Sequence, residues 1–288
     1  MTKFFGTGVA LVTPFDANGN VDYTALANLV KYVSDGGVSY LVALGTTAET
    51  PTLTADEKDK ILACIKSANA GKLPMMLGVG GNSTSDVIEK IKHTDFSGVD
   101  ALLSVAPYYN KPSQAGMQAH YTAIADASPV PVVLYNVPSR TVVNIAPETT
   151  LRLAQHKNII GIKEASGNLT QMGYILRDKS KDFLVISGDD GLAVPLVSIG
   201  GHGLISVAAN VCPKQVSDMV NFALAQKNVE AGRLHLSLME LVDALFAEGS
   251  PVGIKCALQC KSLAENVLRL PLVQASAALT ERMKKILS

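Results

Sequence analysis

Short apolar runs alternate with longer amphipathic segments along this chain. Each run is apolar at consecutive positions rather than at every second one, as in Tyr40-Leu41-Val42-Ala43-Leu44. This pattern is typical of strands that are buried on both faces of a parallel sheet. Eight such strands are predicted, at residues 8–12, 40–44, 74–79, 101–105, 131–135, 158–162, 183–187 and 203–207.

The segments between these runs have apolar residues at helical spacing, and they start at residues that favour helix N-termini. Asp22 precedes one such apolar stripe, and Thr54 with Glu57 forms a capping box before another. Ser83 and Asn168 stand at the same position before later helical segments. A helix is therefore predicted after each strand.

Eight strand–helix units in unbroken alternation fit either a closed (β/α)8 barrel or a doubly wound open sheet. The count of eight favours the barrel, as does the spread of reactive residues over many strand ends. From about residue 225 onward the pattern is helical only. We predict an α/β fold, a (β/α)8 TIM barrel over residues 1–224, with a C-terminal helical extension over residues 225–288. No linker-like sequence separates the two parts, so both are expected to form one structural unit.

Charge and cysteine content narrow the class of protein. Lys plus Arg and Asp plus Glu are both 25, and no basic stripe occurs, which argues against nucleic-acid or membrane-surface partners. No apolar run is long enough to span a bilayer, and the four cysteines show no disulfide framework, so a cytoplasmic location is expected. Cys256 and Cys260 lie one helical turn apart and could share a metal, although buried reduced thiols are favoured because no second ligand pair is near.

The carboxyl ends of barrel strands meet at one rim, where barrel enzymes hold their active sites. No His, Cys or carboxylate cluster with metal-ligand spacing appears there, and His202, the one histidine expected near the rim, is interpreted as a loop residue. Two carboxylates, Asp189 and Asp190, follow the seventh strand and would repel a phosphate cofactor. The residues that the strand ends bring to the rim are Thr46, Thr47, Tyr109, Tyr135, Arg140, Lys163, Gly188 and Ile205.

Lys163 ends the sixth strand. Alternation sends Ile159, Gly161 and Lys163 to one face of the strand, and Ile160, Ile162 and Glu164 to the other. An amine at this place, beside a glycine that leaves room, is a candidate Schiff-base nucleophile. The alternative is a strand-end lysine whose ammonium reaches solvent.

The neighbouring strand ends supply groups that such chemistry needs. Tyr135 can shuttle protons during imine formation, or can be a rim tyrosine packed on Pro138. Thr46 and Thr47 suit a small carboxylate. Arg140 can bind a second carboxylate in bidentate fashion, or can pair with Glu148 at the surface.

Four segments carry a resemblance to a known family. These segments are similar to those of the pyruvate-dependent class I aldolase barrels. They are Gly45-Thr46-Thr47-Ala48-Glu49, residues 107–112, residues 135–141 and Gly161-Ile162-Lys163-Glu164-Ala165. The nearest resemblance is to the dihydrodipicolinate synthase family, and it runs along nearly the whole chain. It implies a homotetramer, a dimer of dimers, that condenses pyruvate with L-aspartate 4-semialdehyde to 4-hydroxy-tetrahydrodipicolinate in lysine and diaminopimelate biosynthesis.

The resemblance also implies residue roles. Lys163 would form the imine with pyruvate, without a metal or separate cofactor, and Tyr135 would donate and accept protons. Thr46 and a Tyr109 that reaches in from the neighbouring subunit would complete the relay. The implied substrate contacts are Thr47 and Ile205 for pyruvate and Arg140 for the carboxylate of the second substrate, and Gly188 is expected to contact substrate as well.

One departure from the family concerns regulation. Feedback-inhibited members often carry a histidine after the motif of the second strand, where this chain has Ala55 and Lys58, although Asn82 and Asp86 could still line a lysine site. Weak or absent inhibition by lysine is therefore predicted. The remaining alternatives are N-acetylneuraminate lyase or a 2-keto-3-deoxy sugar acid aldolase, which generally lack an arginine at the position of Arg140, and a silent barrel that senses 2-oxo acids.

Overall fold

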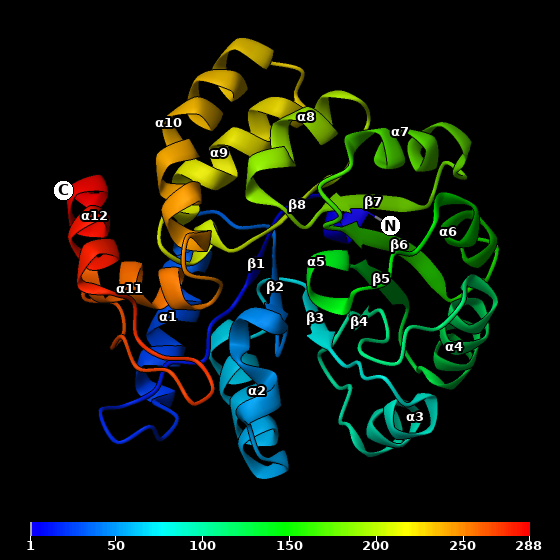
Figure 1. The fold of residues 1–288 in the computed structure, drawn as a ribbon, viewed down its shortest axis with the longest axis horizontal. Helices are drawn as coiled ribbons and strands as arrows, with labels where there is room; N and C mark the ends of the chain where they lie inside the picture. Colours follow the sequence, from blue (N-terminus) through cyan, green and yellow to red (C-terminus); the bar gives the residue numbers. More distant parts are fainter. Residues whose placement is uncertain (1) are drawn as a thin grey trace.

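The computed structural model describes residues 2–288, and within them eight parallel strands close into a barrel in the order β1 to β8 (Figure 1). The barrel closes where β1 pairs with β8, with Gly8 in register with Ile205. The predicted (β/α)8 barrel is confirmed, and each strand begins and ends within two residues of its predicted run. The strands are β1 Gly6–Ala10, β2 Tyr40–Ala43, β3 Met75–Gly78, β4 Ala101–Val105, β5 Val132–Asn136, β6 Ile159–Glu164, β7 Leu184–Ser187 and β8 Gly203–Ser206.

Helices surround the barrel, and the predicted N-terminal caps form. The side chains of Asp22, Ser83 and Asn168 each accept a backbone N–H of the first helical turn, and Thr54 with Glu57 forms the full capping box. The short helix α5, which directly follows β5, was not predicted. The α-helices are α1 Tyr23–Asp35, α2 Ala55–Asn69, α3 Thr84–His93, α4 Gln114–Ala127, α5 Pro138–Thr141, α6 Pro147–Leu153, α7 Leu169–Asp178, α8 Ala193–Ser198, α9 Pro213–Leu224, α10 Asn228–Phe246, α11 Val252–Cys260 and α12 Ala277–Leu287.

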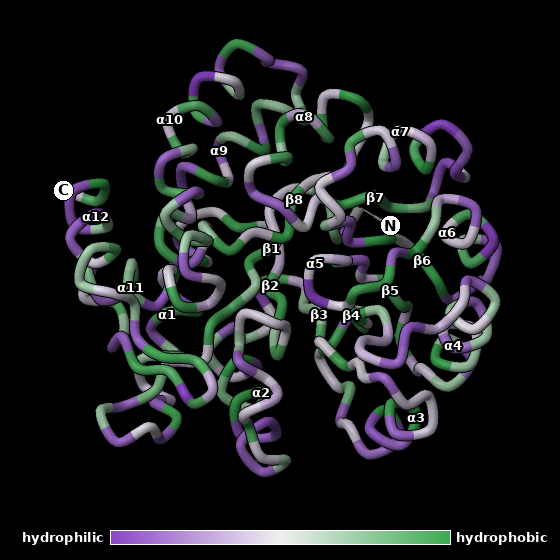
Figure 2. The backbone as a smooth tube through the Cα atoms, viewed as in Figure 1, coloured by the Kyte–Doolittle hydropathy of each residue, from purple (hydrophilic) through white to green (hydrophobic). Residues whose placement is uncertain are grey.

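Side chains from all eight strands fill the barrel interior, including Tyr40, Met76, Leu103, Val133 and Ile186. The other faces of the strands pack against the helices, so the strands are largely hydrophobic in Figure 2 while hydrophilic residues gather on the outer helices and loops. Burial on both faces explains why the runs are apolar at consecutive positions.

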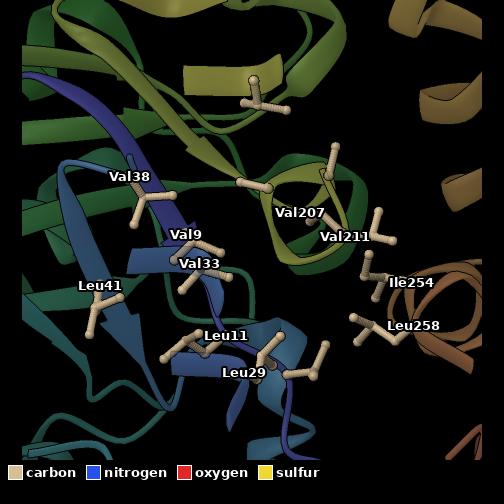
Figure 3. Packing of buried hydrophobic residues seen from close by; sticks show 14 of the residues in the cluster. Val9, Leu11, Leu29, Val33, Val38, Leu41, Val207, Val211, Ile254 and Leu258 are labelled. Carbon is tan, nitrogen blue, oxygen red and sulfur yellow. The ribbon is translucent and has the colours of Figure 1, made fainter. Parts of the chain in front are cut away.

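The C-terminal helices share a hydrophobic cluster with the first strands and helices of the barrel. Ile254 and Leu258 of α11 lie near Val211 and Leu29 in Figure 3, and all four belong to one buried cluster. The helical extension predicted from residue 225 onward is confirmed as α10, α11 and α12.

Strand β6 contains an irregularity that the sequence pattern did not reveal. Val132 pairs with Ile159, but Val133 pairs with Gly161, so Ile160 is an extra residue in β6. A bulge of this kind shifts the alternation of side chains. Ile159 packs in the outer cluster and Ile160 contacts the interior, so the prediction that Ile159 shares a face with Lys163 is wrong.

His202 also lies elsewhere than predicted. It directly precedes β8, so it stands at the amino end of the strands, opposite the rim. Its Nδ1 lies 3.0 Å from the backbone nitrogen of Val185, which donates to it, and its ring meets that of Phe5 edge to face. His202 is a buried structural residue.

Candidate active site

Lys163 and Tyr135 lie side by side at the carboxyl ends of β6 and β5. The two residues are in register, and both are buried, with 6% and 7% of their surface exposed. Lys163 Nζ lies 4.2 Å from the centre of the Tyr135 ring. Among residues 2–288 no carboxylate lies within ion-pair distance of Lys163. A buried amine without a paired carboxylate, next to a phenol, is a suitable nucleophile with its proton carrier.

These two side chains face a cavity of about 510 Å³ at the rim of the barrel. A second cavity of about 330 Å³ lies beside it and shares Thr46, Tyr135 and Arg140 with it. Thr47 and Gly188 line the first cavity as well. The structure therefore brings together six of the eight predicted site residues: Thr46, Thr47, Tyr135, Arg140, Lys163 and Gly188.

The loop after β2 presents Thr46 and Thr47 from a single turn of 3-10 helix, Thr46–Ala48. Leu44 and Glu49, on either side of this turn, have left-handed backbones with φ of 52° and 54°. The Thr50 hydroxyl donates to the carbonyls of Leu44 and Gly45 at 3.0 and 2.8 Å. These bonds hold the loop in a conformation that non-glycine residues rarely adopt.

Arg140 projects from α5, which follows β5 directly. Its guanidinium donates to the backbone carbonyl of Ser250 at 3.1 Å, in the loop between α10 and α11. The alternative of an ion pair with Glu148 does not occur among the ion pairs of residues 2–288. One bond to a carbonyl leaves other donors of the guanidinium free for a ligand.

Gly188, not Gly161, makes room for the lysine. A Cβ at Gly188 would lie 2.9 Å from Lys163 Cε, whereas a Cβ at Gly161 would meet Leu184. The predicted role of Gly161 as the gap beside the amine is therefore wrong. Ile205 lies in the buried interior cluster that also contains Tyr135, and it does not line the cavity around Lys163.

Tyr109 does not reach the site within one chain. It is 87% exposed, and its backbone is left-handed with φ of 73°. Its neighbour Tyr108 lines the second cavity instead. Thr46 and Tyr135 are thus brought together without Tyr109.

A buried polar network, which was not predicted from the sequence, lies directly behind the site. The Glu164 carboxylate is fully buried and accepts hydrogen bonds from Asn136 Nδ2 at 2.9 Å, Gln171 Nε2 at 3.0 Å and the Ser166 N–H at 2.7 Å. Asn136 and Glu164 each follow a site residue on the outer face of its strand, and the two are in register. The sequence signal that could have predicted this network is the polar residue that directly follows each site residue, Asn136 after Tyr135 and Glu164 after Lys163.

A second buried carboxylate fixes the loop after β7. Asp190 accepts hydrogen bonds from the Ser206 hydroxyl and from the Val207 N–H, the latter at 3.0 Å. Burial raises the pKa of Asp190, and these hydrogen bonds oppose the rise. Asp190 therefore ties the loops after β7 and β8 together rather than facing a ligand.

Within residues 2–288 no group of three His, Cys, Asp or Glu side chains is arranged to hold a metal ion. Cys256 and Cys260 are free thiols. None of the helices in the described part of the chain is both long and apolar enough to cross a membrane.

The fold and the site define the protein as a (β/α)8 barrel enzyme with a buried lysine at the carboxyl end of its sixth strand. Residues 3–288 match the sequence model of the dihydrodipicolinate synthetase family. The chain belongs to this family, which confirms the resemblance seen in the motifs.

Individual members of this family are similar to the chain over nearly its full length. The chain is 52% identical to 4-hydroxy-tetrahydrodipicolinate synthase of Flavobacterium psychrophilum over 98% of this chain and 97% of the relative. It is 51% identical to the synthase of Phocaeicola vulgatus over 100% and 97%. The crystal structure of dihydrodipicolinate synthase from Thermotoga maritima superposes with a TM-score of 0.96 at 39% identity, over 99% of this chain and 98% of that one.

Proposed function

We propose that this protein condenses pyruvate with L-aspartate 4-semialdehyde to give 4-hydroxy-tetrahydrodipicolinate, a step in lysine and diaminopimelate biosynthesis. The observation that carries the proposal is the pairing of Lys163 with Tyr135 in register at the mouth of the barrel. Relatives named for this reaction, about half identical over the whole chain, support it.

In the proposed mechanism the neutral amine of Lys163 adds to the ketone carbon of pyruvate, and water leaves to give an imine. Loss of a methyl proton gives an enamine, which attacks the aldehyde carbon of the second substrate. The substrate amine then attacks the imine carbon, closes the ring and releases Lys163. Each addition and elimination moves a proton, which Tyr135 carries from its place beside the amine. The chemistry needs no metal and no separate cofactor, because the substrate itself forms the covalent intermediate.

The remaining site residues bind the substrates. Thr46 relays protons with Tyr135, and Thr47 binds the pyruvate carboxylate at the turn that follows β2. Gly188 flanks pyruvate and leaves space for the lysine stem, whereas Ile205, the other expected pyruvate contact, packs in the interior cluster with Tyr135 and does not line the cavity. The free donors of Arg140 bind the carboxylate of L-aspartate 4-semialdehyde.

Tyr109 belongs to this relay through a second copy of the chain. Its exposure within one chain and the open cavity beside Thr46 and Tyr135 support a neighbouring subunit that places Tyr109 there. The proposed assembly is a homotetramer built as a dimer of dimers, located in the cytoplasm. Residues 1–224 and 225–288 would fold as one unit, since they share a buried cluster.

Inhibition by lysine is proposed to be weak or absent. A relative from Cyanidioschyzon merolae, 39% identical, has been solved with lysine bound. In this chain Lys58 and Lys90 line a cavity with Ala55, and burial together with the charge of Lys90 lowers the pKa of Lys58. These two ammonium groups would repel the side-chain ammonium of lysine, and the single carboxylate that lines the cavity, that of Asp59, offsets only one of them. Titration with lysine in the activity assay tests this, and an inhibition constant in the low micromolar range would contradict it.

Borohydride reduction in the presence of pyruvate tests the mechanism. A mass increase confined to Lys163 is expected, and its absence would refute the imine and favour a silent barrel. Turnover of L-aspartate 4-semialdehyde, compared with N-acetylneuraminate, then separates the synthase from the sugar acid lyases. Arg140 is the residue that favours the synthase, because it offers a site for the second carboxylate.

A further inference from the structure

The loop that carries Thr46 and Thr47 is joined by a fully buried ion pair to residues 255–269, here called the C-terminal segment. Glu49 Oε1 lies 2.5 Å from Lys255 Nζ, and neither side chain has any exposed surface. The backbone N–H of Arg269 donates to the other carboxylate oxygen of Glu49 at 3.1 Å. Both oxygens of Glu49, which ends the loop, are therefore held by residues more than 200 positions away in the sequence.

The cationic side of this pair is itself closely surrounded. Lys255 Nζ donates to the carbonyl of Val267 at 2.8 Å and lies 3.8 Å from the centre of the Phe15 ring. The guanidinium carbon of Arg269 lies 4.5 Å from the same ring. Burial lowers the pKa of Lys255 to about 8, and the carboxylate of Glu49 opposes this shift. A buried ion pair is weak evidence for stability, because desolvation offsets the attraction. The ion pair therefore matters less for overall stability than for the position of the loop segment that it holds.

What it positions is a left-handed turn. Glu49 has φ of 54°, a conformation that costs an ordinary residue free energy and persists where the surroundings impose it. The Thr13 hydroxyl donates to the carbonyl of Ala48 at 2.8 Å and fixes the same turn from the side of β1. If the carboxylate loses its partners, the C-terminal side of the turn is left with the local bonds of Thr50 and Thr52 and the bond from the Arg269 guanidinium to the Thr52 carbonyl at 2.9 Å.

We propose that Glu49 and Lys255 are positioning residues that hold the loop of Thr46 and Thr47 where it receives the pyruvate carboxylate. This inference rests on the proposed function, since it concerns the same substrate and the same lysine. Neither residue touches the cavity around Lys163, so each acts through the loop. The C-terminal segment thereby becomes part of the support of the active site.

The chain offers a matched control on the same segment. The guanidinium of Arg269 donates to the two carboxylate oxygens of Glu57 at 2.8 and 2.5 Å, and Glu57 lies on α2 rather than on the loop. Glu57→Gln removes the charge but keeps a side chain that supports the capping box. Glu49→Gln and Glu57→Gln are therefore the same chemical change against the same segment, and only the first touches the loop.

The experiment measures KM for pyruvate, kcat, melting temperature and borohydride trapping for the wild type and four variants. Glu49→Gln and Lys255→Met are each expected to raise KM for pyruvate about tenfold, because misplacing a binding group by a fraction of an ångström weakens binding and orientation. The double variant is expected to be no worse than either single variant, since both break one interaction. Glu57→Gln is expected to lower the melting temperature while KM stays within about twofold.

Two results would overturn the inference. One is a folded Glu49→Gln enzyme with the KM of the wild type, and the other is an equal rise of KM in Glu57→Gln. If the buried-charge variants do not fold, Thr13→Val removes the bond to Ala48 without a change of charge, and it must raise KM in the same direction. A wild type that does not trap pyruvate refutes the proposed function itself, whereas equal trapping by wild type and Glu49→Gln at pyruvate concentrations below the wild-type KM refutes only the positioning role.

Discussion

Gly188→Ala is the smallest change that should disturb the lysine without touching its chemistry. A Cβ at this position would lie 2.7 Å from Ala165 Cβ, 2.9 Å from Lys163 Cε and 3.1 Å from Lys163 Cγ. Carbon atoms in contact prefer separations of about 3.5–4.0 Å, so the lysine stem must move by roughly 0.5–1 Å. Gly188 does not have a left-handed backbone, so alanine fits the main chain there.

The structure sets the size of the expected effect. A misplacement of about 1 Å in a reacting group can lower the rate by about 10²-fold. That loss corresponds to about 2.7 kcal/mol of activation free energy. The accompanying overpacking costs about 1–3 kcal/mol of folding stability, which a domain of ordinary stability tolerates. The variant should therefore be folded but about a hundredfold less active.

Initial rates with both substrates, the yield of borohydride trapping on Lys163 and the melting temperature check this prediction. Gly173→Ala on α7 is the control, because a Cβ there meets nothing within 4 Å. The control should keep wild-type activity and gain about 0.5–1 kcal/mol of stability from its better helix propensity. A folded Gly188→Ala enzyme with trapping and turnover equal to those of the control would refute the reasoning.

Three further changes test other parts of the structure. Arg140→Ala should leave trapping of pyruvate intact but raise KM for L-aspartate 4-semialdehyde about 10–100-fold, as loss of a charged hydrogen bond implies, and unchanged KM would contradict its role. Tyr109→Phe should lower kcat about a hundredfold or more while each chain still folds, since the side chain is exposed within one chain and phenylalanine keeps its ring; full activity would exclude Tyr109 from the relay. Burial lowers the pKa of Lys255 to about 8, below that of an unfolded lysine, so the unfolded state binds more protons above pH 8. Lys255→Met removes the ammonium that faces Glu49 and Arg269. The free energy of unfolding of the wild type relative to this variant should therefore rise from pH 8 to about 10, by up to about 1.4 kcal/mol per pH unit. Urea titrations in which the free energies of unfolding of the two proteins change equally with pH would contradict this.

Local signals account for what the sequence could predict. Strand positions follow from runs that are apolar on both faces, and helix starts follow from caps such as Asp22 and Thr54, because both depend on neighbours in the chain. The rim residues follow in turn, since the carboxyl ends of all parallel strands converge. Lys163 and Tyr135 could be placed side by side for that reason alone.

Non-local pairing accounts for what the sequence could not predict. The bulge at Ile160 depends on the register of β6 against β5, which no pattern within β6 encodes. The room for the lysine comes from Gly188, which directly follows β7, and not from Gly161, which lies on the same strand as Lys163. The contact of Glu49 with Lys255 joins residues that only the closed fold brings together.

The bulge and the polar network together explain how the site keeps its alignment. A slip of β6 by one residue against β5 would turn the side chains of β6 to the other face, so Lys163 would leave the cavity and lose its place beside Tyr135. Ile160 sets the register on the amino side of the pair, and the Asn136–Glu164 hydrogen bond fixes it on the carboxyl side. Because side chains alternate, the residue after each site residue must lie on the outer face of its strand, where the helices can bury a pair of polar side chains. The buried carboxylate of Glu164 accepts three hydrogen bonds, and a slip of the strand would leave this carboxylate without those partners in the protein interior.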